Sequence, residues 1–346
     1  MSRIIISKTR NGILIKHKNK SILIDPDGNQ GIPNKPDAIL ISHAHSDHIR
    51  GLKYVYSKGV KVILSKETYA ILLSLGYKFY SRDLIFVKPG DRLSLSGFEL
   101  AVYNAGHIFG SCMFSIELPR VTIGYTGDFN FEDTVIMRKA DLIDADVLLI
   151  DATYGHPLFS FPPREILYKL IRENLKKLVE SGVVPILHGY ALGKGQELTR
   201  IAYDFIGGIV SVTKSVAKFN RLYENLNKSS LGNYVIGANG DVLIKGLKGV
   251  RETKNNKYKR LIFSGWTIKY GRGGFPLSSH SGFTKIIDYI ARVEPDFIVP
   301  LYSNAPFLAR LIQKEFGIRA DFFMNSKKGG NEDIVYGISL RGLSSI

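Results

Sequence analysis

Residues 39–52 read ILISHAHSDHIRGL, and this segment decides what kind of fold the chain has. Three of the eight histidines lie here within six residues, directly after the apolar run AILIS. His43 and His45 are two apart on a chain that leaves a strand, so their imidazoles project to the same side, and Asp47 and His48 follow on the turn. Each of these groups is costly to bury without a partner. Because imidazole nitrogens and carboxylate oxygens are zinc ligands, the segment predicts a metal site at a strand end.

Three further motifs place metal-binding side chains after apolar runs. YNAGHIFGS supplies His107, YTGDF supplies Asp128, and ILIDPDG supplies Asp25. We expect His107 and Asp128 to complete the site. The carboxylate of Asp128 could bridge two metals. We expect Asp25 to orient the cluster through hydrogen bonds to the ligands.

The composition bears on the cellular compartment and on the kind of partner. The chain has 346 residues, and 47 Lys+Arg against 31 Asp+Glu give a formal net charge of +16. Such a charge is typical of proteins that bind nucleic acid or anionic membranes, although a solvated lysine-rich surface explains it equally well. Cys112 is the single cysteine, so an intramolecular disulfide is excluded. No signal peptide or transmembrane run is visible, so we expect a cytoplasmic protein, or one found with DNA in the nucleoid or nucleus, without a membrane partner.

The pattern of apolar residues changes near residue 155. Before it, short runs such as GILIKH, AILIS and VLLID predict strands. After it, FPPREILYKLIRENLKKLVESG has apolar residues at helical spacing, and further strand and helix patterns alternate. Residues 245–260 are strongly basic, and either contact with a nucleic acid backbone or a solvated hairpin explains them equally well. This order predicts an α/β protein with two mixed sheets, helices outside them, and an inserted α/β segment.

The motifs resemble those of a known superfamily. HAHSDH, AGHIFGS, YTGDF and LIDPDG look like the four motifs of the metallo-β-lactamase fold hydrolases. The resemblance implies an αββα sandwich with metals at the strand ends.

The second half of the chain resembles one branch of that superfamily, the β-CASP nucleases. IDATYGHPLFSFP looks like their first signature with Asp151 as its acid, and FSGWTIKYGRGGFPLSSHSGF looks like the segment that carries their histidine, here His280. HGYALGKGQEL looks like their Gly-Lys loop. The resemblance implies a metallo-β-lactamase core over residues 1–155, a β-CASP cap inserted over 156–262, and a return to the core over 263–346.

Two positions resemble the DNA-processing branch of the β-CASP family. The RNA-processing branches usually have Glu where this chain has Asp151, and a histidine ligand where this chain has Tyr302. Both differences are similar to the Artemis-like and interstrand-crosslink-repair nucleases. The difference at Tyr302 also leaves a second metal with fewer ligands, which implies one firmly bound Zn²⁺ and a weaker second site that Zn²⁺, Mg²⁺ or Mn²⁺ could fill.

The resemblance implies a role for each candidate residue. The first metal would be bound by His43, His45 and His107, and the second by Asp47 and His48, with Asp128 between them. The catalytic residues would be Asp47, Asp128, Asp151 and His280. Asp151 would position a ligand or handle protons, and His280 would contact the scissile phosphate or protonate the leaving oxygen.

The Gly-Lys loop and the Ser-x-His signature supply the candidates for substrate binding. These are Gly193, Lys194, Ser278 and Ser279, since backbone N–H groups at a helix start and a lysine can hold a terminal phosphate. An ordinary loop explains GYALGKGQ equally well without the family context. Trp266, Tyr190 and Tyr270 could stack on bases, but we expect each to pack in the core.

The hypothesis from the sequence is therefore a zinc-dependent DNA nuclease of the repair branch that degrades 5′-phosphorylated ends from 5′ to 3′. The first alternative is a β-CASP ribonuclease of the RNase J or mRNA 3′-end-processing type. A thioesterase or lactonase and a catalytically inactive nucleic-acid scaffold remain further alternatives.

Overall fold

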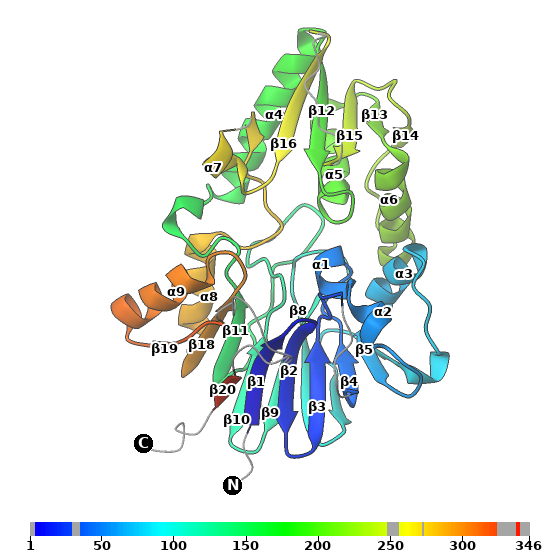
Figure 1. Cartoon of the computed structure of the whole chain (residues 1–346). Helices are drawn as coiled ribbons and strands as arrows, with labels where there is room; N and C mark the ends of the chain where they lie inside the picture. Colours follow the sequence, from blue (N-terminus) through cyan, green and yellow to red (C-terminus); the bar gives the residue numbers. More distant parts are fainter. Residues whose placement is uncertain (1–3, 30–34, 248–255, 272, 324–336, 340–346) are drawn as a thin grey trace.

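The computed structural model describes residues 4–29, 35–247, 256–271, 273–323 and 337–339, and within them the strands form three sheets. Two seven-stranded sheets lie face to face in the lower half of Figure 1, and a six-stranded sheet lies above them. Helices cover the outer faces of the two lower sheets. This αββα sandwich with an added α/β layer confirms the fold class predicted from the sequence.

The first sheet of the sandwich holds the N-terminal strands in the order β20-β1-β2-β3-β4-β5-β6. Its strands are β20 (Gly337–Ser339), β1 (Ile4–Thr9), β2 (Gly12–His17), β3 (Lys20–Ile24), β4 (Ala38–Leu40), β5 (Lys61–Ser65) and β6 (Leu84–Val87). Its outer helices are α1 (Ser46–Ile49), α2 (Leu52–Val55) and α3 (Lys66–Ser74).

The second sheet has the order β19-β18-β11-β10-β9-β8-β7. Its strands are β19 (Arg319–Ala320), β18 (Phe297–Leu301), β11 (Val147–Asp151), β10 (Val121–Tyr125), β9 (Cys112–Leu118), β8 (Phe98–Asn104) and β7 (Arg92–Leu95). Its outer helices are α8 (Phe283–Val293) and α9 (Ala305–Leu311), and a π-helical turn (Ile312–Phe316) continues α9.

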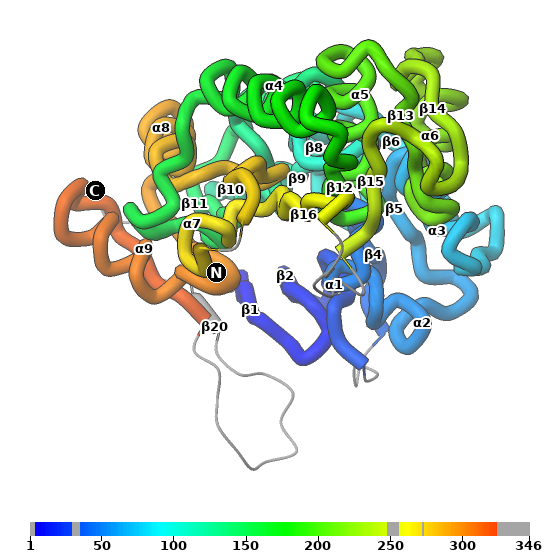
Figure 2. The backbone as a smooth tube through the Cα atoms, turned by 90° about the horizontal axis from the view of Figure 1, so that it is seen from above, coloured from blue at the N-terminus to red at the C-terminus, as the bar shows by residue number. Residues whose placement is uncertain are grey.

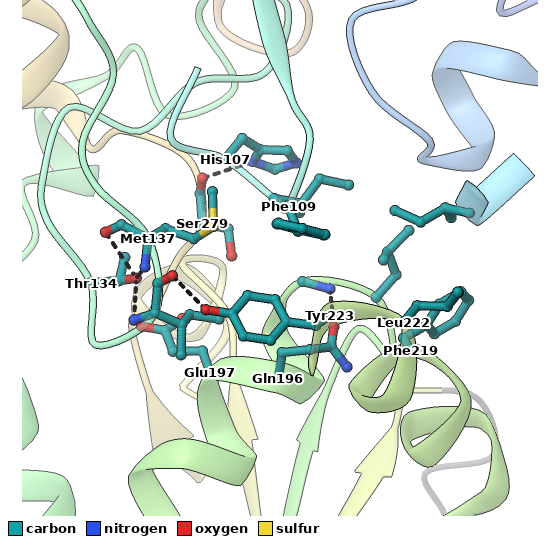
Figure 3. A pocket seen from close by; sticks show the side chains of 15 residues that line it. His107, Phe109, Thr134, Met137, Gln196, Glu197, Phe219, Leu222, Tyr223 and Ser279 are labelled. Atoms are coloured by element: carbon teal, nitrogen blue, oxygen red, sulfur yellow. Dashed lines mark hydrogen bonds between the residues drawn. The ribbon is translucent and has the colours of Figure 1, made fainter. Parts of the chain in front are cut away.

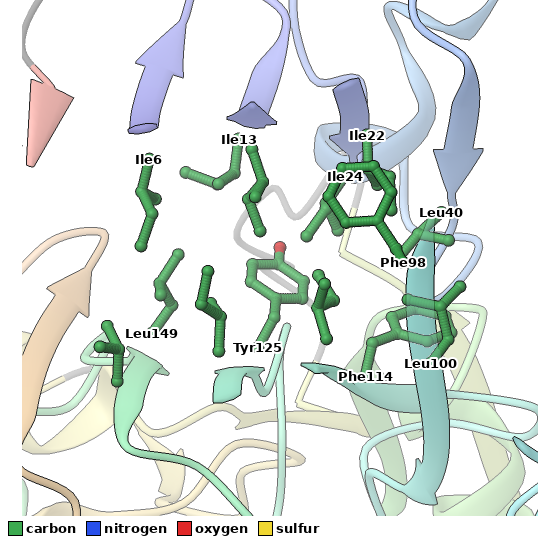
Figure 4. Close-up of a cluster of buried hydrophobic side chains, with 14 of the residues drawn as sticks. Ile6, Ile13, Ile22, Ile24, Leu40, Phe98, Leu100, Phe114, Tyr125 and Leu149 are labelled. Atoms are coloured by element: carbon green, nitrogen blue, oxygen red, sulfur yellow. The ribbon is translucent and has the colours of Figure 1, made fainter. Parts of the chain in front are cut away.

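The core of the sandwich is built from alternating side chains of its strands. In β3, Ile22 and Ile24 point toward the second sheet, whereas Leu23 points toward the outer helices, because successive side chains of a strand face opposite sides. Figure 4 shows Ile22 and Ile24 facing Phe98 and Phe114 across the interior. Since both faces of β3 are covered, its uniformly apolar sequence is explained.

The six-stranded sheet is parallel throughout and has the order β14-β13-β15-β12-β16-β17. Its strands are β14 (Tyr234–Ile236), β13 (Val210–Val212), β15 (Val242–Gly246), β12 (Val184–Gly189), β16 (Tyr258–Phe263) and β17 (Gly274–Phe275). The helices α4 (Arg164–Glu180), α5 (Lys194–Ile206) and α6 (Lys214–Asn227) pack next to one another against it (Figure 2).

We call this layer the cap, and we propose that it is the inserted unit. The structure shows that its sheet continues to β17, past residue 262, so we propose that the cap ends after Phe275. Part of the basic run, residues 248–255, lies outside the described residues. None of the described helices has the length and apolarity needed to cross a membrane.

Candidate metal centre

The metal-binding candidates follow the carboxyl ends of core strands. β4 leads into His43 and His45, β8 into His107, and β10 into Asp128. The two sheets are joined at this edge, because the backbone N–H of Cys112 donates to the carbonyl oxygen of Ser42 at 2.8 Å. The sandwich therefore brings together side chains that are far apart in the sequence.

The position of the Asp128 side chain depends on a glycine in the preceding turn. Gly127 has φ of +51°, and a Cβ there would lie 2.8 Å from the Ser42 hydroxyl oxygen. Only a residue without a side chain fits both the left-handed backbone and this close approach. The turn YTGD therefore carries Asp128 directly over the histidines of the first sheet.

Four side chains converge at this edge, with ligand atoms within 4.8 Å of one another: His43, His45, His107 and Asp128. His43 Nε2 lies 3.4 Å from Asp128 Oδ2, and His107 Nε2 lies 3.5 Å from the same oxygen. His43 Nε2 is fully buried and has no hydrogen-bond partner among the described residues. A buried nitrogen without a partner is rare in proteins, and a metal would supply the missing bond.

Hydrogen bonds from the other ring nitrogens fix the orientation of these imidazoles. His107 Nδ1 donates to the carbonyl oxygen of Ser279 at 2.7 Å, so the Nε2 atom of His107 carries a lone pair and no hydrogen. His48 Nδ1 lies 2.8 Å from Asp25 Oδ2, which also accepts from the hydroxyl of Tyr125. Asp25 thus already has several hydrogen-bond partners, and its expected role of orienting the metal ligands stays a prediction.

His45 and His107 provide a direct test of whether the cluster fits a metal. His45 Nε2 lies 3.3 Å from the carbonyl oxygen of Leu192, so it carries the hydrogen and leaves a lone pair on Nδ1. That Nδ1 lies 3.0 Å from His107 Nε2, which also has a lone pair. Burial, followed by the charge of His43, lowers the pKa of His45 to about 3, and burial lowers the pKa of His107 well below its usual value. A bound cation, rather than a proton, is therefore the natural partner of both lone pairs.

Asp128 presents its two oxygens to different histidines. Oδ2 faces His43 and His107, whereas Oδ1 lies 3.3 Å from His48 Nε2. Burial alone would raise the pKa of Asp128, but His48 and His280 hold it well below its usual range, so the group is a carboxylate. This geometry suits a carboxylate that bridges two divalent metals.

The structure does not bring Asp47 into the cluster. Asp47 is exposed in the four-residue helix α1, and the ligand atoms that group with His48 belong to Asp25 and His43. The helical turn that begins at Ser46 directs His48 inward and leaves Asp47 at the rim. Its expected role as a ligand of the second metal stays a prediction that the described geometry supports less than the others.

Asp151 and His280 form a pair beside the cluster. His280 Nδ1 lies 2.7 Å from Asp151 Oδ2, and His280 Nε2 lies 3.7 Å from Asp128. Burial alone would lower the pKa of His280, but Asp128 and then Asp151 outweigh it and raise the pKa to about 9. Asp151 thus holds a histidine whose other nitrogen faces the cluster.

A cavity of about 530 Å³ opens over the cluster between the core and the cap. His45, His107, Asp128 and His280 line it from the core. Residues after the carboxyl ends of β12 and β16 line it from the cap, and ligands commonly bind at this edge of a parallel sheet. Its volume is large enough for part of a nucleic acid chain.

The predicted substrate-binding residues lie at this cavity but already have partners. Lys194 Nζ is buried against Glu197 at 2.5 Å, and burial lowers the pKa of Lys194 to about 8. The N–H of Gly193 donates to Gln196 Oε1 at 2.7 Å, so it is not open to a phosphate. The Ser278 hydroxyl accepts from the N–H of His280, and Ser279 holds His107. Their roles in binding stay predictions.

A family model for the metallo-β-lactamase superfamily matches residues 9–180, which contain all the residues of the four-ligand cluster. The chain has a metallo-β-lactamase domain. The strands that complete its second sheet, β18 and β19, follow the cap in the sequence.

Curated relatives of the chain include nucleases. The RNase J-like protein of Methanocaldococcus jannaschii is 30% identical over 49% of this chain and 44% of its own length. RNase aCSPSF2 of Saccharolobus solfataricus is 25% identical over 56% of this chain and 45% of its own length. DNA ligase 6 of Arabidopsis thaliana is 24% identical over 76% of this chain and 21% of its own length. Each match thus spans less than half of the relative.

A solved structure shares the fold of nearly the whole chain. It is a protein of unknown function from Enterococcus faecalis V583, with a TM-score of 0.65 and 14% identity. The likeness covers 98% of this chain and 100% of that one.

The metallo-β-lactamase core and the cap meet at a buried arginine that the sequence analysis did not single out. The Arg164 guanidinium donates to Glu132 at 3.3 Å, to Glu197 at 2.6 Å and to the carbonyl oxygen of Ser278 at 2.8 Å. Arg164 thus connects the core, α5 and the segment of Ser278 and Ser279, whose Ser279 carbonyl oxygen accepts the hydrogen bond from His107. Arg164 follows two prolines at a helix start, a position that carries no local sign of its distant partners.

A second contact between core and cap encloses a small cavity of about 20 Å³ (Figure 3). Tyr223 of α6 donates to the carbonyl oxygen of Ile136 in a core loop at 2.9 Å. His107 and Phe109 lie on the core side of this cavity. A space of this size holds about one water molecule, so substrate belongs in the larger cavity.

Proposed function

We propose that this chain is a metal-dependent nuclease of the β-CASP type that hydrolyses phosphodiester bonds of RNA. The observation that carries the chemistry is the placement of Asp128, with one oxygen facing His43 and His107 and the other facing His48. The preference for RNA is supported by relatives that are themselves named as ribonucleases.

The proposed site divides its work among the described side chains. His43 Nε2, His45 Nδ1, His107 Nε2 and Asp128 would hold the first metal, and His48 with Asp128 would hold the second. When bound, a zinc ion lowers the pKa of a coordinated water to about 7 and offsets the charge of the phosphate. Asp151 keeps the Nδ1 proton of His280 in place, so His280 Nε2 faces the cavity and can donate to a phosphate or a leaving oxygen.

We also propose that the second metal is held less firmly than the first. Tyr302 stands where a further ligand would be expected, but its hydroxyl lies 3.3 Å from that of Tyr125, which donates to Asp25. A phenol is a poor zinc ligand near neutral pH because its pKa is about 10. Metal analysis after dialysis should find less than one equivalent of the second metal, and Tyr302→His should increase it, with Tyr302→Phe as the control.

A DNA nuclease of the repair type is the second candidate function. Asp151 and Tyr302 favour it, and the match to DNA ligase 6 covers the largest share of this chain among the three relatives. These observations have less weight than the ribonuclease relatives, which match at higher identity.

One assay separates these functions. End-labelled single-stranded RNA and DNA of one sequence, each with a 5′-phosphate or a 5′-hydroxyl, would be incubated with zinc-loaded protein. We expect faster cleavage of RNA, and release of mononucleotides from the 5′-phosphorylated end would indicate 5′-to-3′ exonuclease activity. Faster cleavage of DNA would favour the second candidate, and hydrolysis of a thioester or lactone without any nuclease activity would contradict both.

A further inference from the structure

A line of aromatic rings runs outward from the proposed catalytic histidine. The ring centroid of His280 lies 5.9 Å from that of Tyr154, which lies 5.1 Å from Trp266, which lies 6.2 Å from Tyr270. Trp266 and Tyr270 belong to the segment around helix α7 (Thr267–Tyr270), which follows the carboxyl end of β16.

The exposure of these rings rises with distance from the metal centre. Tyr154 is buried at 3% exposure, Trp266 is partly buried and lines the large cavity, and Tyr270 is 55% exposed. The expectation that Tyr270 packs in the core was therefore wrong. The same expectation was wrong for Tyr190, which is 62% exposed at this edge of the cap, where its ring centroid lies 6.2 Å from that of His45.

Packing accounts for only part of this arrangement. Tyr154 and Phe159 each lie 5.1 Å from Trp266 between ring centroids, which anchors the indole to the core. Tyr270 is 55% exposed, so more than half of its surface stays open to a ligand. The ammonium of Lys269 lies 5.6 Å from the centre of the Tyr270 ring, so a cation stands beside this aromatic surface.

We propose that Trp266 and Tyr270 form a stacking subsite for the bases of a single-stranded nucleic acid whose backbone reaches the metal centre. This proposal rests on the proposed nuclease function. Every base has a π-face, so neighbouring exposed rings bind a strand without regard to sequence. A duplex keeps its bases stacked on one another, so the subsite accepts only unpaired nucleotides.

The test uses Trp266, the single tryptophan of the chain, as its own probe. Zinc-loaded protein would be titrated with phosphorothioate oligoadenylate, with an abasic phosphorothioate strand of equal length, and with a duplex, while tryptophan fluorescence is recorded. Stacking on the indole predicts quenching by oligoadenylate and little change with the other two ligands. Equal quenching by the abasic strand, or no quenching by oligoadenylate, would overturn the proposal.

A pair of variants then tests Tyr270. Tyr270→Leu should weaken oligoadenylate binding about tenfold, which corresponds to about 1.4 kcal/mol, and should leave binding of the abasic strand unchanged. Tyr54→Leu is the matched control, because it removes a tyrosine of similar exposure, 46%, that also has a lysine beside its ring but lies in α2, outside the line of rings that starts at His280. Equal affinities of Tyr270→Leu and Tyr54→Leu for oligoadenylate would overturn the role of Tyr270.

Cleavage of an ordinary phosphodiester strand by the same preparation keeps the two proposals apart. Cleavage without quenching would refute the stacking subsite and retain the nuclease. Quenching without cleavage of any nucleic acid would refute the nuclease and retain the subsite.

Discussion

His45 Nδ1 and His107 Nε2 face each other at 3.0 Å, and the hydrogen bonds of both rings leave a lone pair on each of these nitrogens. Two lone pairs at this distance repel unless a cation lies between them or near both. Burial keeps the pKa of both imidazoles low, so protonation does not relieve the repulsion near neutral pH. The folded chain is thus arranged in advance for a metal.

Zinc should therefore stabilise the folded chain. A metal that binds only the folded state at a free concentration 100 times its dissociation constant adds about 2.7 kcal/mol to the free energy of unfolding. Differential scanning calorimetry of chelated and zinc-loaded protein measures this gain. His45→Ala should lose most of it, whereas His156→Ala, outside the described metal clusters, should retain it. An equal gain in both variants would place the zinc elsewhere.

Asp128→Asn should abolish cleavage while leaving the secondary structure intact. The amide keeps the shape of the side chain but removes the negative charge that faces His43, His48 and His107. Bound zinc should fall below that of wild type, measured by elemental analysis beside circular dichroism and a cleavage assay. Cleavage by this variant at a rate near wild type would contradict the assignment of the whole centre.

The pair of His280 and Asp151 should give the metal-free chain a recognisable pH dependence. The pKa of His280 rises from about 6.5 in the unfolded chain to about 9 in the folded chain. Its stabilising effect is therefore complete below about pH 6.5 and is lost as the pH rises through about 9, with a size of at most about 3 kcal/mol. Denaturant unfolding of chelated wild type and His280→Asn should differ most at low pH and converge at about pH 10. A difference that does not change with pH would show that His280 does not titrate in this way.

Arg164 should influence metal binding from outside the cluster. Arg164→Lys keeps the charge but cannot reach Glu132, Glu197 and the Ser278 carbonyl together, so the segment that orients His107 should loosen. We expect roughly tenfold weaker zinc binding. Arg164→Met should cost about 3 kcal/mol of stability, because it removes one of the two cations that pair with the buried carboxylate of Glu197, and Lys194 is the other. Arg292→Lys, which changes an exposed ion pair, is the control for both measurements. Unchanged zinc affinity in Arg164→Lys would reduce Arg164 to a purely structural role.

The sequence predicted those parts of the site that follow strands in short motifs. HAHSDH, AGHIFGS and YTGDF place His43, His107 and Asp128 after apolar runs, and their shared edge follows from the sandwich. Asp47 was harder to place, because the spacing alone does not show that the turn at Ser46 is helical and rotates the side chain outward.

The contacts that orient the ligands could not be predicted in the same way. The carbonyl oxygens of Leu192 and Ser279 fix the tautomers of His45 and His107, and backbone carbonyls have no residue-specific signature. Arg164 contacts Glu132 and Glu197 only because the cap folds back on the core. The same folding leaves Tyr190 and Tyr270 at the surface, although aromatic side chains usually pack in the core.

Cleavage should depend on metal bound at the histidine cluster. A titration of chelated protein with zinc that follows both bound zinc and cleavage of single-stranded RNA in the same samples measures this dependence. We predict no cleavage without metal and a rate that rises as the cluster fills, with full activity at two equivalents or fewer. Full cleavage by metal-free protein, or no cleavage of RNA or DNA by protein whose cluster is filled, would contradict the claim.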